Sequence, residues 1–173
     1  MTRLPTIVGL AIACMLVGSP VSAGLLAERT RVLVRGDDAL AAETLALRAD
    51  QGDADAQAQL GFMYEQGRGV VKSYDLAVHW YVCAAEQGHT AAQYLLGLMY
   101  AKGRGVQRND MLAYQWLNVA AARAPQRAKE YYARIRDAVA KKLTPAQIIE
   151  AQRLAAKFVV KDARMPGKPE IDR

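Results

Sequence analysis

A repeat with a period of 36 residues is the feature that most constrains the fold of this chain. Residues 49–70 align with residues 85–106 when the sequence is shifted by that number, and Trp80 then falls on Trp116. A period of this length is typical of stacked helical repeats, in which each unit buries its apolar face against its neighbours. The sequence therefore predicts an array of stacked units.

Each unit is predicted to be a pair of antiparallel helices. Apolar and small residues recur at helical spacing in the first helix of each pair and again in the second. Gly61 and Gly97 interrupt the first helices, and glycine lowers helix propensity by about 1 kcal/mol. We therefore expect a neighbouring helix to approach closely at both glycines, and we expect Trp80 and Trp116 to belong to the core. The stripes of the first helices are Gln57, Leu60, Gly61 and Tyr64, then Gln93, Leu96, Gly97 and Tyr100.

A glycine-rich segment, QGRGV at 66–70 and KGRGV at 102–106, separates the two helices of each unit. A phosphate-binding loop would follow a strand and precede a helix whose N-terminus faces the ligand, and neither context is present. The glycines are instead predicted to provide the dihedral angles of a tight turn. Arg68 and Arg104 are then exposed turn residues that could contact a partner.

These motifs resemble the Sel-one-like repeat family, which is related to the tetratricopeptide repeats. The resemblance is specific over residues 49–122. It implies an all-α, right-handed superhelical solenoid of antiparallel helix pairs with about seven helices. We expect a repeat domain at 37–160, with repeats near 54–88 and 90–124 and caps at 37–52 and 126–160. In the second cap, Thr144 and Gln147 are expected to form a capping box. Residues 161–173 are expected to form a mobile tail.

The N-terminus has the pattern of a secretory signal peptide, with an apolar run after Arg3 and small residues at Val21 and Ala23. Cleavage after Ala23 would make the protein periplasmic or secreted, and the alternative is a membrane anchor. Residues 24–36 are undecided between helix and coil. Net charge is −2 over residues 24–122 and +7 over residues 123–173. The basic end could contact an anionic surface, and nucleic acid is not an expected partner outside the cytoplasm.

Residues with catalytic potential are few and poorly placed. Ser73 and His79 are six residues apart, on nearly opposite sides of one helix. His79 and His89 lack the spacing of a metal site. We therefore expect neither catalysis, a metal nor a cofactor. A cysteine-rich branch of the family is associated with β-lactam binding or hydrolysis, but its paired cysteines are missing from these repeats. A cell-wall glycan, peptide or β-lactam binder or hydrolase is the alternative.

The resemblance implies an adaptor that holds a protein or peptide of the cell envelope in the concave groove of the superhelix. If first helices line that groove, the residues beside the packing stripe face it. An apolar end at Phe62, Tyr94 and Leu98 would anchor the partner. The candidate groove residues are Asp55, Phe62, Glu65, Tyr94, Leu98, Arg127 and Arg134.

Overall fold

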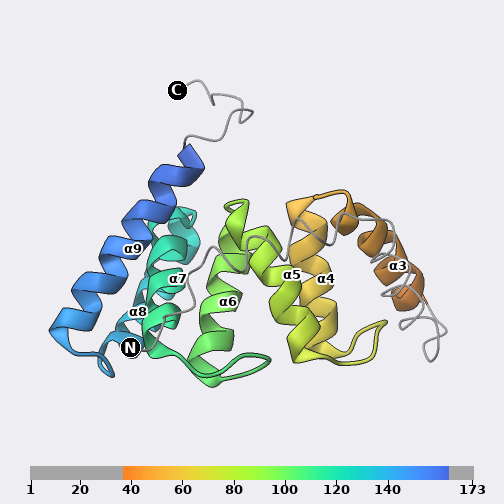
Figure 1. The fold of residues 1–173 in the computed structure, drawn as a ribbon. Helices are drawn as coiled ribbons and strands as arrows, with labels where there is room; N and C mark the ends of the chain where they lie inside the picture. Colours follow the sequence, from red (N-terminus) through yellow and green to blue (C-terminus); the bar gives the residue numbers. More distant parts are fainter. Residues whose placement is uncertain (1–36, 164–173) are drawn as a thin grey trace, which may run out of the picture.

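The computed structural model describes residues 37–163, with side chains described up to residue 158. This part of the chain forms seven α-helices and no strand, which confirms the predicted all-α solenoid (Figure 1). The predicted signal peptide (1–23), the undecided segment (24–36) and residues 164–173 of the predicted tail lie outside the described residues. The helices are α3 (Asp37–Asp50), α4 (Ala54–Gln66), α5 (Tyr74–Glu86), α6 (Thr90–Lys102), α7 (Asp110–Arg123), α8 (Gln126–Ala140) and α9 (Pro145–Ala163).

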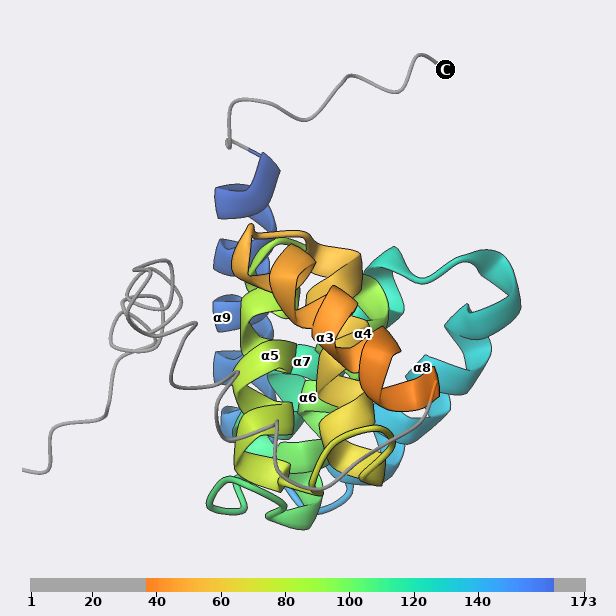
Figure 2. The same ribbon diagram turned by 90° about the vertical axis from the view of Figure 1, so that its right-hand side faces the viewer.

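The helices divide into two rows. The first helices of the units, α4, α6 and α8, lie on one side, and α5, α7 and α9 lie on the other (Figure 2). Each first helix packs against the second helix before it and, in the two complete units, against the one that follows. Among the described helices, none is long and apolar enough to cross a membrane.

Helix boundaries repeat with the same period even where the capping residue changes. Asp53 begins α4 by accepting hydrogen bonds from backbone N–H groups, and His89 begins α6 in the same way through Nδ1. Gly67 and Gly103 end these helices with φ of 73° and 65°. These are left-handed conformations that glycine adopts without a steric penalty. The predicted turn is therefore confirmed in both units.

The two packing glycines lie where helix pairs approach most closely. A Cβ atom on Gly61 would lie 2.8 Å from the ring of Tyr81, and one on Gly97 would lie 2.7 Å from the side chain of Leu117. Both distances are too short for ordinary contact. The predicted close approach at the two glycines is thus confirmed.

The core is apolar apart from three buried glutamines, of which Gln57 and Gln93 occupy the repeated position and Gln115 lies on α7. Trp80 and Trp116 are buried, as predicted. The amide groups of Gln57 and Gln93 are also buried and donate to the carbonyl oxygens of Ala49 and Ala85, each at 3.0 Å. Each glutamine therefore adds a second hydrogen bond to a carbonyl at the end of the preceding second helix, which also accepts from the N–H of Gly52 or Gly88.

The C-terminal pair departs from the repeat. Helix α9 packs against α7 rather than forming a hairpin with α8. Phe158 meets Trp116 edge to face at 5.0 Å, and Gln152 donates to the Tyr114 hydroxyl at 3.0 Å. The predicted capping box is confirmed by hydrogen bonds between Thr144 and Gln147. The terminal helix thus packs beside α7 and extends to Ala163, so residues 161–163 are helical and the prediction that the tail begins at residue 161 was wrong.

Candidate interaction surface

The glycine-rich turns are contacts between units. A Cβ atom on Gly69 would lie 2.2 Å from the carbonyl oxygen of Asp38, and one on Gly105 would lie 2.3 Å from that of Tyr74. Asp38 and Tyr74 occupy equivalent positions at the N-termini of α3 and α5. Each turn therefore presses against the start of the second helix in the preceding unit.

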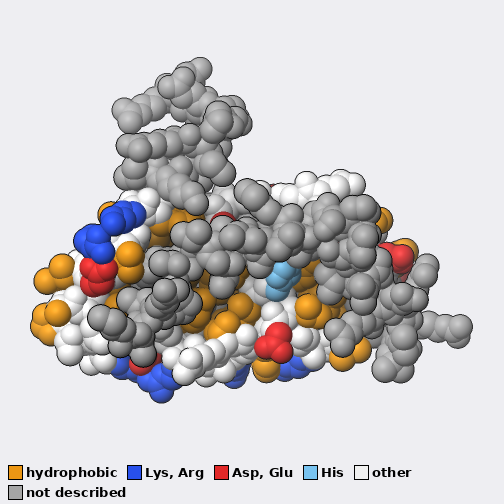
Figure 3. Space-filling model, in the orientation of Figure 1, with side chains coloured by type: hydrophobic (Ala, Val, Ile, Leu, Met, Phe, Trp, Pro, Cys, Tyr) orange, Lys and Arg blue, Asp and Glu red, His pale blue; other side chains and the backbone are white. Residues whose placement is uncertain are grey.

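The side chains of the two turn arginines contact these same two residues, Asp38 and Tyr74. Arg68 forms an ion pair with Asp38 at 2.9 Å, and the Arg104 guanidinium lies 5.5 Å from the centre of the Tyr74 ring. The Asp38 carboxylate raises the pKa of Arg68. Both arginines are exposed, as predicted, and each already contacts this chain. In Figure 3, Lys and Arg side chains gather along the edge where these turns lie.

The surface of the first-helix row carries the candidate groove residues, and we call it the first-helix face. It consists of Asp55, Phe62, Glu65, Tyr94, Leu98, Arg127, Tyr131, Tyr132 and Arg134. Phe62, Leu98 and Arg134 occupy equivalent positions in α4, α6 and α8, so the repeat places them in a row across the array. Phe62 is 43% exposed, Leu98 is half-buried and Arg134 is exposed.

Three tyrosines join α6 to α8 on this face. Tyr94 stacks on Tyr132 with ring centroids 4.2 Å apart, and its hydroxyl donates to that of Tyr131 at 3.2 Å. Burial, and then the contacts with Tyr131, raise the pKa of Tyr94. Tyr131 itself remains 46% exposed. Sequence reasoning singled out Tyr94 and missed its two partners, which directly follow Glu130, the residue one period downstream of Tyr94.

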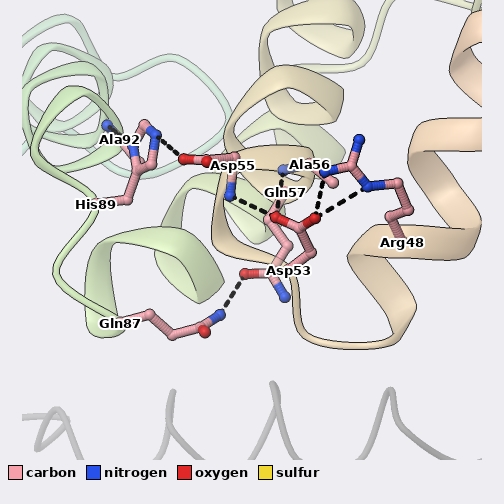
Figure 4. Close-up of polar contacts among 8 residues, drawn as sticks. All are labelled: Arg48, Asp53, Asp55, Ala56, Gln57, Gln87, His89 and Ala92. Atoms are coloured by element: carbon pink, nitrogen blue, oxygen red, sulfur yellow. Dashed lines mark hydrogen bonds and ion pairs between the residues drawn. The ribbon is translucent and has the colours of Figure 1, made fainter. Parts of the chain in front are cut away.

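The two predicted acidic residues contact neighbouring helices. Asp55 lies 3.2 Å from Nε2 of His89, which links the starts of α4 and α6 (Figure 4). Glu65 accepts a hydrogen bond from the Tyr81 hydroxyl at 2.9 Å. Burial, followed by the charge of Glu65, raises the pKa of Tyr81. Both carboxylates therefore have a structural contact within this chain.

The two predicted basic residues lie on α8. Arg127 is exposed. Arg134 is exposed as well, and its guanidinium lies 5.7 Å from the centre of the Tyr131 ring. The face thus runs from an apolar side chain on α4 to an aromatic and cationic group on α8.

Ser73 and His79, the residues considered for catalysis, both make contacts that belong to the fold. Ser73 caps α5 by accepting a hydrogen bond from the Leu76 N–H. His79 packs edge to face against Trp80 at 5.1 Å, and burial lowers its pKa. In the described part of the chain, no three His, Cys, Asp or Glu side chains form a group suited to a metal.

Comparison with known proteins identifies the repeats. Residues 54–89 and 90–125 each match the family model described as Sel1 repeat. The structure resembles a protective antigen of uropathogenic Escherichia coli that displays an SLR fold, with 25% identity and a TM-score of 0.67 over 92% of this chain and 34% of that one. It also resembles a Sel1 repeat protein from Oxalobacter formigenes, with 34% identity and a TM-score of 0.51 over 64% of this chain and 46% of that one.

The chain thus spans about a third and about half of these two proteins. No curated protein matches it. Sel1 repeat proteins generally mediate protein–protein interaction and generally act as non-catalytic scaffolds. The two matched segments coincide with the helix pairs α4–α5 and α6–α7. The predicted resemblance is therefore confirmed, and the chain carries two Sel1 repeats.

Proposed function

We propose that this protein is a non-catalytic adaptor of the cell envelope that binds a protein or peptide across its first-helix face. The exposed Phe62 is the observation that carries the proposal. A phenylalanine that is 43% exposed leaves much of its apolar surface in water, and burial of that surface would be favourable. An apolar side chain from a partner would bury it.

Phe62 does not stand alone on the face. Leu98 follows it in the row, and the exposed edge of Tyr131 lies near the end of the row, where it is joined to Tyr94. Tyrosine and arginine are enriched among residues that dominate binding energy at protein interfaces. Apolar groups spaced across parallel helices suit a partner helix or an extended peptide. Location in the envelope rests on the N-terminal sequence pattern.

The proposal is tested by comparing partner capture by two variants of the full chain. Phe62→Asp/Leu98→Asp places two charges on the first-helix face. Val71→Asp places a charge on another exposed apolar residue, 56% exposed, in the turn between α4 and α5. Circular dichroism must show that both variants fold as the native chain does.

We expect proteins cross-linked from an envelope fraction by the native chain to be captured equally by Val71→Asp and lost from the double variant. Capture that survives the double change would exclude the first-helix face as the binding surface. Turnover of a chromogenic β-lactam by the purified chain would contradict a non-catalytic role.

A further inference from the structure

Helix α8 carries an exposed stripe that lines a shallow hollow of about 460 Å³. We call this set the α8 stripe: Glu130, Ala133, Arg134, Asp137, Ala138 and Lys141. Spacings of three and four residues place all of them on one face of the helix. Val139, Ile135 and Ala140, on other sides of α8, pack against the core, so the stripe is the part of the helix that stays outside it.

One residue of the stripe, Ala133, lies where complete units receive their second helix. Gly61 and Gly97 meet Tyr81 and Leu117 of the following helix, and Ala133 occupies the equivalent position in α8. The next helix, α9, packs against α7 instead. Within residues 37–163, the face of α8 that corresponds to a helix-docking face is thus left without a following helix.

The charges of the stripe are complementary to the same stripe in reverse order. When the helix is paired with a second copy running in the opposite direction, Glu130 faces Lys141 and Arg134 faces Asp137. Ala133 then faces Ala138 of the other copy. All three pairings share one centre, between residues 135 and 136. A two-fold axis at that point produces the full set of contacts at once, as a closed symmetric dimer requires.

We propose that the chain forms a homodimer in which the α8 stripes of two copies pack antiparallel about this axis. The small side chains of Ala133 and Ala138 allow the two helices to approach closely at the centre. Four ion pairs between copies surround them, because each of the two pairings occurs twice. The second copy thereby occupies the position that a following second helix takes in a complete unit.

The contacts within one copy are compatible with this arrangement. Arg136 contacts Oδ1 of Asp137 through both Nε and a terminal nitrogen, at 2.8 and 2.7 Å. Arg136 also donates a hydrogen bond from Nη1 to Oδ1 of Asn118, at 3.3 Å. Oδ2 of Asp137 is the atom that Arg134 of the second copy would reach. Arg134 lies over the Tyr131 ring from its own helix, which keeps its guanidinium at the surface.

Other occupants match the stripe less well. Two acidic and two basic residues alternate along it, so its net charge is zero. An anionic membrane or a uniformly acidic peptide would meet Glu130 and Asp137 with repulsion. Acidic and basic residues that alternate in this way face residues of opposite charge when a second copy of the helix runs antiparallel. This is the pattern expected when a helix binds a copy of itself.

The test uses two charge variants that can pair with each other but not with themselves. Glu130→Lys/Asp137→Lys makes the stripe wholly basic, and Arg134→Glu/Lys141→Glu makes it wholly acidic. In a mixture of the two, all four ion pairs are restored. Lys129→Glu/Lys157→Glu reverses two exposed charges outside the stripe, one on α8 and one on α9, and is the matched control. Sedimentation velocity measures the mass of each, after circular dichroism has confirmed the fold.

We expect the native chain and the control to sediment as dimers, with a dissociation constant that rises with salt because ion pairs surround the interface. Each charge variant alone should be monomeric, and the equimolar mixture should form a heterodimer. A monomeric native chain, a dimer of either charge variant, or a mixture that stays monomeric would each overturn the proposal. Phe62→Asp/Leu98→Asp should remain dimeric, so this test fails or succeeds independently of the proposed adaptor role.

Discussion

The guanidinium of Arg68 lies 2.9 Å from Asp38, thirty residues earlier in the chain, and this ion pair spans two adjacent units of the array. Both side chains are about half exposed or more, at 64% and 47%. Water screens such a pair, so its contribution to stability is small. The backbone contact beside it, between Gly69 and the carbonyl of Asp38, is expected to matter more.

Gly69→Ala is predicted to destabilise the protein more than Gly52→Ala. Both glycines have positive φ, 70° and 90°, which costs another residue about 1–2 kcal/mol. A methyl group at Gly69 would also lie 2.2 Å from the Asp38 carbonyl oxygen, whereas one at Gly52 would meet nothing within 4 Å. Urea unfolding of both variants measures the difference. Equal losses would show that the array opens at this turn without cost.

The glycine at the helix contact gives a second prediction. Gly97→Ala improves helix propensity by about 1 kcal/mol, yet the new methyl would lie 2.7 Å from Leu117. Overpacking of this kind costs about 1–3 kcal/mol, so we expect a net loss of stability. In a double-mutant cycle, Gly97→Ala/Leu117→Ala should be less destabilising than the sum of the single changes. Additive free energies of unfolding would mean that the two sites do not press on each other.

The local features of this fold could be predicted, and the contacts between distant segments could not. The left-handed turn at Gly67, the buried Trp80 and the Thr144 capping box follow from residue type and spacing within one helix or turn. Docking of α9 on α7 depends on Phe158 meeting Trp116, and neither residue signals the other in the sequence.

In the candidate site, too, local features could be predicted from the sequence and tertiary contacts could not. Exposure of Phe62 followed from its place beside the packing stripe. The contact of Asp55 with His89 depends on how α4 and α6 stack, and the contact of Glu65 with Tyr81 depends on how α4 packs against α5. Tyr131 was missed because the stacking of tyrosines between α6 and α8 is a tertiary contact.

The repeated glutamine gives a third prediction. Gln93 is fully buried, and its amide donates to the carbonyl oxygen of Ala85. Gln93→Leu would remove one of two hydrogen bonds to this carbonyl, which also accepts from the Gly88 N–H, and the loss of a typical hydrogen bond costs about 0.5–1.5 kcal/mol. Gln59→Leu, at an exposed position of α4, is the matched control and should change stability little. If chemical denaturation gives the same midpoint for both variants, the buried glutamine does not stabilise the junction between units.

The last prediction concerns pH and His79. Burial lowers the pKa of this histidine, and its Nε2 atom is buried without a hydrogen-bond partner in the described chain. The unfolded chain therefore binds the proton more readily, with a pKa of about 6.5 for an exposed histidine. This contribution to stability should be present above about pH 6.5, the unfolded value, and should be lost as the pH falls below it toward the lower folded-state pKa.

The chain has two histidines, and a His89→Asn background removes the other one while keeping an N-cap for α6. In this background, the free energy of unfolding from urea titrations should decrease toward pH 5.5. Adding His79→Leu should flatten that dependence, because the carboxylates titrate mainly at lower pH. A slope that is the same with and without His79 would show that protons bind it equally in the folded and unfolded chain.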